Sequence, residues 1–332
     1  MKVAVYSSRP WDESFLSEAN TGHELVFLKA GLDPTTISLA AGCEAVCLFV
    51  NDTADAQVIG ALASLGVHAI VLRSAGFNHI DLDAANANGI VVVRVPAYSP
   101  HAVAEHTIGL MLAVNRRIPR AHNRVRDGDF RLNGLLGVDM VGKTAGVIGT
   151  GKIGAAVARI LVGFGMEVVA HDPYPNDEVV SLGARYVGLD ELFGTSAAIS
   201  LHCPLTPDTY HLIDEAAIGE MKQHPMLVNT SRGSLIDTVA AIEGLKSGQL
   251  GALAIDVYEE EGDLFFKDLS DTMIQDDVFS RLLTLPNVLV TGHQAFFTRE
   301  AVGQIAATTI ANLDALATGE VPPTVVTSDL LG

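Results

Sequence analysis

The sequence predicts an α/β protein built from two domains, each with a parallel sheet that helices cover on both faces. Three observations predict this fold class. Short apolar runs alternate with helical stretches through the first hundred residues, a glycine-rich turn joins an apolar run to a helical one near residue 149, and further apolar runs follow to the end. With 332 residues, the chain is long enough for two domains of ordinary size.

Composition narrows the class of protein. The chain is 48% hydrophobic and 18% charged, which is typical of a globular protein, and its formal net charge of −18 argues against nucleic acid or an anionic membrane as partner. No apolar run approaches the roughly 18 residues of a membrane span, and the chain opens on a strand rather than a signal peptide. Three cysteines, an odd number without a C-x-x-C pair, predict a reducing compartment and no disulfide framework. A cytoplasmic location is expected, and no metal site is expected.

The first hundred residues predict a smaller parallel sheet. Apolar runs of strand length are separated by helical stretches, and no G-x-G-x-x-G occurs among them. The expected strands are Lys2–Tyr6, Glu24–Leu28, Ala45–Phe49, Ala69–Leu72 and Val91–Val95, and the expected helices are Thr36–Ala41, Asp55–Leu65 and Leu82–Asn88.

Two loops in this half follow strands, where ligands of open α/β sheets bind. Ala75 and Gly76 lie in the first, and such small residues leave backbone N–H groups free to hold a carboxylate. Tyr98 lies in the second and is placed to face a cleft. An ordinary glycine turn and a packed aromatic side chain are the alternatives.

A long helix is expected next. Ser99 and Pro100 form a helix start, and the stretch from His101 to Arg117 is rich in alanine, leucine and methionine. His106 within it is interpreted as a packed or capping histidine rather than a catalytic one.

The second domain is expected to hold six strands in the doubly wound nucleotide-binding arrangement. A helical tail from residue 300 to 317 is expected to return to the first domain, which makes that domain discontinuous. The predicted division is residues 1–100 with 298–332 for the first domain and 101–297 for the second. The expected strands are Thr144–Ile148, Glu167–His171, Ala197–Leu201, Pro225–Asn229, Gly251–Val257 and Asn287–Thr291.

The glycine turn indicates a dinucleotide site. Gly149 allows the tight turn, Gly151 lets the backbone approach a pyrophosphate, and Gly154 lets helix and strand pack closely. A plain strand–helix turn is the alternative on spacing alone. Asp172, 18 residues past Gly154 at the end of the next strand, is placed for a ribose 2′-hydroxyl and repels a 2′-phosphate. NAD is therefore expected rather than NADP.

Three ionisable residues follow three later strands, at the edge of the sheet where the cofactor is expected. Reduction of a ketone places negative charge on the carbonyl oxygen, and His293 can donate the proton. Glu261 would hold the imidazole and stabilise its protonated form, and Arg232 can pair with a carboxylate. The alternatives are a solvated acidic loop, in which spacing does not choose among residues 259–261, and a structural or phosphate-binding role for the arginine.

Several motifs together are similar to those of the D-isomer-specific 2-hydroxy acid dehydrogenase family over nearly the whole chain, most of all to its fermentative D-lactate branch. These motifs are Gly149-Thr150-Gly151-Lys152-Ile153-Gly154, His171-Asp172-Pro173-Tyr174-Pro175, His202-Cys203-Pro204-Leu205-Thr206, Asn229-Thr230-Ser231-Arg232-Gly233, Asp256-Val257-Tyr258-Glu259 and Thr291-Gly292-His293-Gln294-Ala295-Phe296.

The resemblance implies roles for the site residues. Arg232 would orient the substrate, and His293 would be the acid/base. Glu261, five residues past Asp256, would be the glutamate that tunes His293. It also implies that Ala75 and Gly76 hold the carboxylate and that Tyr98 and Phe296 line the methyl pocket. The implied cofactor residues are Gly149, Gly151, Lys152, Ile153, Gly154, Asp172, Cys203, Pro204, Thr209, Thr230, Ser231 and Asp256.

The function implied is NAD-dependent, reversible reduction of pyruvate to D-lactate. The fold implied is a flavodoxin-like substrate domain and a Rossmann NAD-binding domain with a cleft between them. The cleft is expected to close about hinges near residues 99–101 and 296–299, and a homodimer or homotetramer is expected. Two alternatives are a dehydrogenase for a bulkier 2-oxo acid, such as phenylpyruvate or 2-oxoisocaproate, and a non-catalytic NAD(H)-sensing corepressor. His79 departs from the family, which usually has an amide there.

Overall fold

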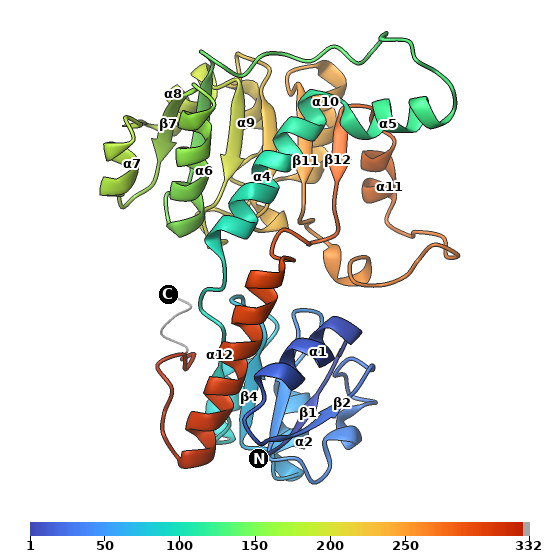
Figure 1. Cartoon of the computed structure of the whole chain (residues 1–332), viewed down its shortest axis with the longest axis vertical. Helices are drawn as coiled ribbons and strands as arrows, with labels where there is room; N and C mark the ends of the chain where they lie inside the picture. Colours follow the sequence, from blue (N-terminus) through green and yellow to red (C-terminus); the bar gives the residue numbers. More distant parts are fainter. Residues whose placement is uncertain (328–332) are drawn as a thin grey trace. The chain divides into compact units, whose positions relative to one another are not determined.

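The computed structural model describes residues 1–327 and contains two compact units, each with one parallel sheet (Figure 1). The first unit comprises residues 1–99 and the chain from residue 297 onward. The second comprises residues 100–296. The predicted fold class, with two doubly wound parallel-sheet domains, is confirmed.

The sheet of the first unit has five strands in the order β2-β1-β3-β4-β5, all paired in parallel. This order is that of flavodoxin-like folds. All five strands lie where the apolar runs predicted them, one or two residues shorter in four cases. Their bounds are β1 Lys2–Val5, β2 Glu24–Phe27, β3 Ala45–Leu48, β4 Ala69–Leu72 and β5 Val91–Val93.

Alternation along these strands builds a core on both faces. Val3 and Val5 pack on one side with α1 (Pro10–Ala19) and α12 (Arg299–Thr318). Ala4 and Tyr6 belong to the core on the other side, with α2 and α3. Successive residues of a strand point to opposite faces, so a parallel sheet with helices on both sides is apolar throughout. The bounds of these helices are α2 Ala56–Ser64 and α3 Leu82–Ala87.

Two elements of this unit differ from expectation. The helix expected at 36–41 is a single 3-10 turn, Ile37–Ala40. Helix α1 was not predicted, because only Asp12 and Leu16 are buried along it and its apolar periodicity is weak. The sequence nevertheless contains a helix-start pattern here, because Pro10 occupies the first turn and Asp12 and Glu13 follow it.

The second unit has seven parallel strands in the order β12-β11-β10-β9-β6-β7-β8. The six expected strands are all present. The seventh, β8, has only two residues at the sheet edge, too few to leave a periodic signal. The bounds are β6 Thr144–Ile148, β7 Glu167–His171, β8 Arg185–Tyr186, β9 Ala198–Leu201, β10 Met226–Asn229, β11 Ala252–Ile255 and β12 Val288–Val290.

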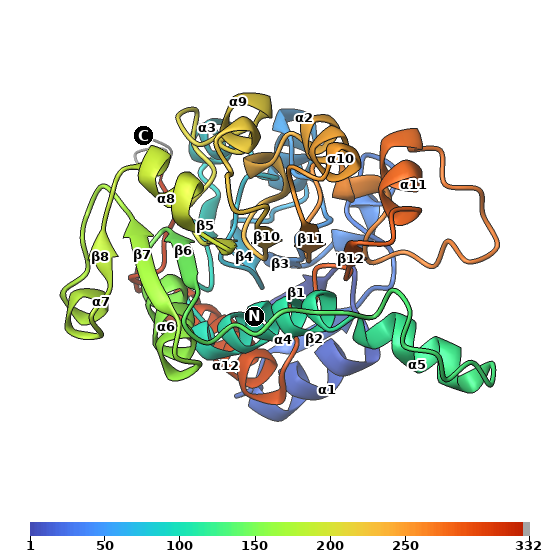
Figure 2. The ribbon, with the colours of Figure 1, turned by 90° about the horizontal axis from the view of Figure 1, so that it is seen from above.

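Helices cover both faces of this sheet as well. Helices α4 (Pro100–Asn115) and α6 (Lys152–Gly163) pack together on one face, and α9 and α10 pack on the other (Figure 2). The strand order reverses between β6 and β9, and this topological switch point is where such folds bind dinucleotides. The remaining helices are α5 Ile118–Arg126, α7 Asp177–Ser181, α8 Leu189–Thr195, α9 Glu215–Gly219, α10 Thr238–Ser247 and α11 Asp277–Leu283.

The helix expected from His101 to Arg117 ends two residues early. Arg117 takes a left-handed conformation with φ +51°, and α5 starts directly after it with Pro119 in its first turn. Proline disrupts the interior of a helix, but in the first turn of α5 its missing N–H costs nothing. Within residues 1–327, no helix is long and apolar enough to cross a membrane.

Candidate active site

The glycine turn lies at the switch point, between β6 and α6. Gly149 has φ +89°, and a Cβ there would lie 2.4 Å from the backbone nitrogen of Cys203. A Cβ at Gly154 would lie 1.9 Å from the carbonyl oxygen of Gly149, so neither position admits a side chain. A Cβ at Gly151, by contrast, meets nothing within 4 Å. The backbone is therefore bare where the helix begins, and this cradle fits the pyrophosphate of a dinucleotide.

Asp172 lies beside this turn, directly after β7. Its Oδ2 accepts hydrogen bonds from the backbone nitrogen of Thr150 at 2.6 Å and from the Thr150 hydroxyl at 3.1 Å, and its Oδ1 accepts from the nitrogen of Tyr174 at 2.8 Å. These bonds hold a half-buried carboxylate at the end of the second strand, where it can accept from the ribose hydroxyls of NAD. Lys152 and Ile153 open helix α6 next to it.

The loops after β9 and β10 are joined by side-chain hydrogen bonds. The Ser231 hydroxyl donates to the carbonyl oxygen of Cys203 at 2.8 Å, and the Thr230 hydroxyl bonds that of Thr107 on α4, also at 2.8 Å. Thr209 donates to the carbonyl of Pro204 at 2.6 Å. These predicted cofactor residues thus lie at the carboxyl edge of the sheet, near the glycine turn.

Two groups after β9 are uncharged. Burial lowers the pKa of His202 to about 3, and its Nε2 lies 2.7 Å from the Ser200 hydroxyl. Burial likewise raises the pKa of the Cys203 thiol to about 11. Neither is poised for acid–base or nucleophilic work at neutral pH.

Arg232 follows β10 in a loop that Asn229 organises. The Asn229 amide donates to the carbonyl of Arg232 at 2.8 Å and accepts from the nitrogen of Ser231 at 2.9 Å. The Arg232 guanidinium donates to the carbonyl of Ser231 at 2.8 Å. A Cβ at Gly233 would lie 2.1 Å from the carbonyl carbon of Tyr258, so this loop packs directly on the backbone that leads to Glu261.

His293 and Glu261 are in direct contact. Nδ1 of His293 lies 2.8 Å from Oε1 of Glu261, and Oε2 of Glu261 accepts from the nitrogen of Tyr258 at 3.1 Å. Because a carboxylate can only accept, Nδ1 of His293 must carry the proton of this bond, and Nε2 remains to exchange a proton with a substrate. His293 has φ +53°, a strained conformation for a residue with a side chain, and such strain gathers at functional sites.

Asp256 fixes the backbone that carries His293. Its carboxylate is fully buried and accepts from the Thr291 hydroxyl at 2.5 Å and from the nitrogens of Gln294 and Ala295 at 2.9 and 2.7 Å. Its carbonyl accepts from the nitrogen of His293 at 2.7 Å. Burial alone would raise the pKa of Asp256, but hydrogen bonds that favour the anion outweigh it and hold the pKa below its usual value.

His106 is a member of the same network, which sequence reasoning missed. Its Nε2 lies 3.2 Å from the Thr291 hydroxyl and 3.4 Å from Oδ1 of Asp256. The interpretation as a packed rather than reacting histidine agrees with these contacts. The predicted long helix was the one sequence feature that could have pointed to His106. Only the packing of α4 on β11 and β12 brings residues 106, 256 and 291 together.

Aromatic residues pack around the pair. Leu264, Phe265 and Phe266 follow the short 3-10 turn Glu261–Asp263, and the Phe266 ring lies 5.6 Å from the His293 ring. Phe265 belongs to a small core with Tyr258 and Phe279. Phe296, predicted to line a methyl pocket, is buried.

The predicted substrate residues of the first unit follow β4 and β5. Ala75 and Gly76 lie in the loop after β4, which begins at Arg73, a buried arginine paired with Asp12 at 3.5 Å. Tyr98 is half-buried in the loop after β5. His79 lies further along the first loop. Burial lowers its pKa to about 4, and its Nε2 has no hydrogen-bond partner within residues 1–327.

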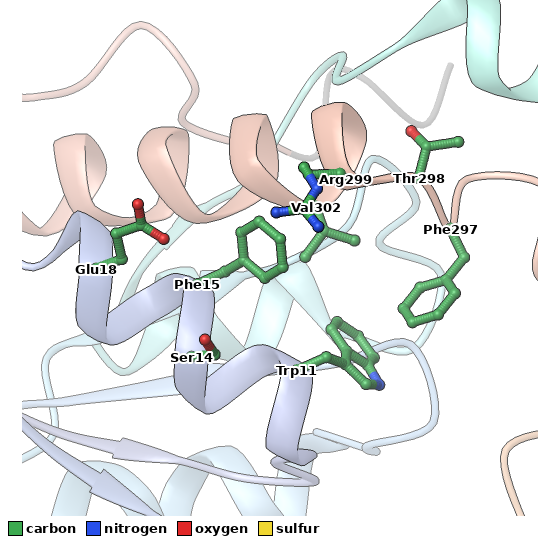
Figure 3. Close-up of a pocket in the computed structure, with 8 residues that line it drawn as sticks. All are labelled: Trp11, Ser14, Phe15, Glu18, Phe297, Thr298, Arg299 and Val302. Carbon is green, nitrogen blue, oxygen red and sulfur yellow. The ribbon is translucent and has the colours of Figure 1, made fainter.

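A separate pocket of about 420 Å³ lies in the first unit, between α1 and the start of α12 (Figure 3). The rings of Trp11 and Phe297 meet there edge to face, 5.0 Å apart, and Arg299 and Glu18 supply its charges. None of the residues predicted for the active site lines it.

Comparison with known proteins decides the family. The family model described as "D-isomer specific 2-hydroxyacid dehydrogenase, NAD binding domain" matches residues 108–295. The chain belongs to this family. It is therefore an NAD-binding oxidoreductase.

Members of the family are similar to this chain over nearly its full length. The D-lactate dehydrogenase of Escherichia coli (strain K12) is 56% identical over 97% of this chain and 99% of its own. The apo-structure of the D-lactate dehydrogenase from Escherichia coli superposes with a TM-score of 0.91 at 53% identity, covering 98% of this chain and all of that one. The NAD-complexed 2-hydroxyacid dehydrogenase of Lactobacillus delbrueckii ssp. bulgaricus superposes with a TM-score of 0.81 at 30% identity over 98% and 100%.

Among residues 1–327, no group of three or more histidine, cysteine or acidic side chains is arranged to hold a metal ion.

Proposed function

We propose that the chain is an NAD-dependent D-lactate dehydrogenase that reduces pyruvate reversibly. The observation that carries the proposal is the Glu261–His293 pair, 2.8 Å apart, on the same sheet edge as the glycine turn. The high identity to an enzyme named D-lactate dehydrogenase, over nearly the whole of both chains, supports the choice of substrate.

In the proposed reaction, His293 donates the proton at Nε2 to the carbonyl oxygen of pyruvate, and it takes a proton from the hydroxyl of D-lactate in reverse. Glu261 holds the ring through Nδ1 and stabilises the imidazolium. NADH, when bound, supplies the hydride that reaches the carbonyl carbon. Arg232 pairs with the carboxylate and draws electron density from the carbonyl, which holds the substrate in one orientation.

The same proposal assigns the cofactor contacts. Gly149, Gly151 and Gly154 provide the bare turn for the pyrophosphate, and Asp172 accepts from the ribose hydroxyls. A 2′-phosphate would place a second negative group beside Asp172, so NADH is the expected reductant rather than NADPH.

Steady-state turnover tests the function. A panel of pyruvate, 2-oxoisocaproate and phenylpyruvate is measured with NADH and with NADPH. The expected result is the highest kcat/KM for pyruvate with NADH. A higher value for a bulkier acid would assign the enzyme to that substrate, and NADH binding without turnover of any 2-oxo acid would indicate a sensor.

A homo-oligomer is proposed from the surface of the second unit. The segment between α5 and β6 carries large apolar side chains that are exposed to solvent within residues 1–327. Phe130, Leu132 and Leu136 are 75%, 80% and 92% exposed. These three side chains lie within seven residues of one another along the chain, and in a dimer or tetramer a second copy would cover them.

A cytoplasmic location is also proposed. Its support is that all three cysteines are buried and unpaired, which a reducing compartment allows. Fractionation of the source cells tests it directly.

A further inference from the structure

The loop after β4 presents two unpartnered backbone amides. Within residues 1–327, no acceptor is bonded to the backbone nitrogen of Ala75 or of Gly76. The same loop has its carbonyls engaged, because the Ser74 hydroxyl donates to the carbonyl of Gly76 at 2.8 Å and the nitrogen of Val95 donates to that of Ser74 at 3.1 Å. Free donors beside satisfied acceptors make the loop selective for an anion.

Arg94 engages the remaining carbonyl. Its Nη1 donates to the carbonyl oxygen of Ala75 at 2.9 Å, and its guanidinium lies 5.0 Å from the centre of the Phe77 ring. In a trans peptide the C=O and the following N–H point in opposite directions, and the chain contains no cis peptide among residues 1–327. The bond from Arg94 therefore directs the N–H of Gly76 away from the guanidinium.

The charge on Arg94 also strengthens this donor. A cation at the carbonyl oxygen withdraws electron density from the peptide and makes its N–H a better hydrogen-bond donor. The half-buried position of Arg94 limits screening by solvent. In a chain with a net charge of −18, an anion needs such local positive groups.

The carboxyl-terminal segment holds Arg94 in place. The nitrogen of Arg94 donates to the carbonyl of Thr324 at 3.1 Å, and the side-chain amide of Asn312, on α12, donates to the carbonyl of Arg94, also at 3.1 Å. The Thr324 hydroxyl donates to the Asn312 carbonyl at 2.6 Å. An antiparallel bridge between Val93 and Val325 extends the sheet, so the carboxyl-terminal chain adds to the edge of β5.

We propose that Arg94 is a positioning residue of the substrate site. It acts through the Ala75–Gly76 peptide, whose N–H it aims and polarises toward the substrate carboxylate, and residues 312 and 324 hold it there. The identity of that carboxylate as part of a 2-oxo acid rests on the proposed function. The site thus depends on chain more than two hundred residues away from the loop that touches the anion.

The test compares Arg94→Met with Arg94→Lys and with Lys2→Met. Methionine keeps the packing on Phe77 but removes the charge and the donor. Lys2 lies on the same unit at the start of β1, pairs with Glu24 at 2.9 Å, and its loss changes the net charge by the same amount. Initial rates are measured over pyruvate and NADH, and oxamate, an unreactive carboxylate of similar size, is titrated calorimetrically into each NADH-bound protein.

The expected result for Arg94→Met is an increase of about tenfold in both the KM for pyruvate and the Kd for oxamate, the size of a lost charge-assisted hydrogen bond. The KM for NADH and the Tm should stay near wild type. Lysine should restore part of the affinity, and Lys2→Met should change neither constant. Thr324→Val should weaken oxamate binding less than Arg94→Met does.

Other outcomes overturn the proposal. Equal effects of Arg94→Met and Lys2→Met would indicate net charge alone, and a fall in Tm and NADH affinity at unchanged oxamate affinity would indicate a structural role. If the wild type turns over no 2-oxo acid yet binds oxamate in an Arg94-dependent way, the proposed function fails while the anion site stands. No oxamate binding by the wild type would end the inference.

Discussion

At the scale of single residues, environment decides which of eleven histidines can exchange protons. Burial of their rings lowers the pKa values of His202 and His79 to about 3 and about 4. His106 bonds to a threonine and a buried carboxylate. His293 keeps a carboxylate on one ring nitrogen and has the other available for a substrate. We therefore propose His293 as the proton donor.

Replacing His293 by glutamine should abolish turnover. Glutamine can still bond to Glu261, but it has no proton to donate near neutral pH, and loss of a general acid costs roughly 10²- to 10⁴-fold. Stopped-flow rates of pyruvate reduction check this, with fluorescence titration of NADH as control. Retention of wild-type kcat would show that another group donates the proton.

His79 should make the protein sensitive to acid. Its pKa is lowered from an ordinary 6.5 to about 4, so below pH 6.5 the unfolded chain binds a proton that the folded chain refuses. Stability is therefore lost as pH falls from 6.5 toward 4. At pH 5 the loss is about 2 kcal/mol relative to pH 7. Urea unfolding at both pH values should show that His79→Asn loses about 2 kcal/mol less than wild type, and an equal loss in both would contradict the assignment.

At the scale of elements, function lies in the loops that leave the carboxyl ends of strands. The turn after β6, the loops after β9 and β10, and the residues after β11 and β12 converge because parallel strands end at one edge. Hydrogen bonds then set the spacing of these segments. Ser231 donates to Cys203, Thr291 donates to Asp256, and the bond between Thr230 and Thr107 ties the loop after β10 to α4.

The three glycines of the turn should respond differently to alanine. Gly151→Ala should fold with a near-native Tm, because its Cβ meets nothing within 4 Å. Its affinity for NADH should fall, because the added methyl group would contact the pyrophosphate. Gly154→Ala should lower Tm by several degrees, because its Cβ would lie 1.9 Å from a backbone oxygen. Differential scanning fluorimetry and NADH titration distinguish the two, and the reverse pattern would contradict this placement of the cofactor.

At the scale of the whole molecule, each unit has its own two-sided core, and the carboxyl-terminal helix α12 belongs to the core of the first unit. The sheet edge of each unit carries residues predicted for the substrate. The stretch of residues 130–136 after α5, with three highly exposed apolar side chains, belongs to neither core. Assembly with a second copy is the role proposed for it.

Leu136→Glu should weaken that assembly. A glutamate buried in an apolar interface loses its hydration without a partner, so the mass in solution should shift toward the monomer. Val180→Glu, a change at an apolar residue of α7 that is also exposed, is the control and should leave the mass unchanged. Sedimentation velocity measures both, and an unchanged mass for Leu136→Glu would place the interface elsewhere.

Much of the fold was predictable because its signals are local. The apolar runs predicted eleven of the twelve described strands, and the glycine spacing placed the turn, since both depend on neighbouring residues. Elements without a local signal were missed: two-residue β8, weakly patterned α1 and the restart of the helix at Pro119. Spacing alone did not choose among residues 259–261, and it was the family resemblance that selected Glu261. The structure places Glu261 against His293.

Apolar periodicity and motif spacing are enough to establish the α/β class, the dinucleotide turn and the residue types of the site. That Asp256, Thr291 and His106 form one network behind His293, and that Arg94 bonds to the carbonyl of Ala75, emerges only from the folded chain. These partners lie far apart in the sequence. Local patterns report the conformation of neighbours, whereas a hydrogen bond between residues 106 and 291 exists only once a sheet and a helix have packed together.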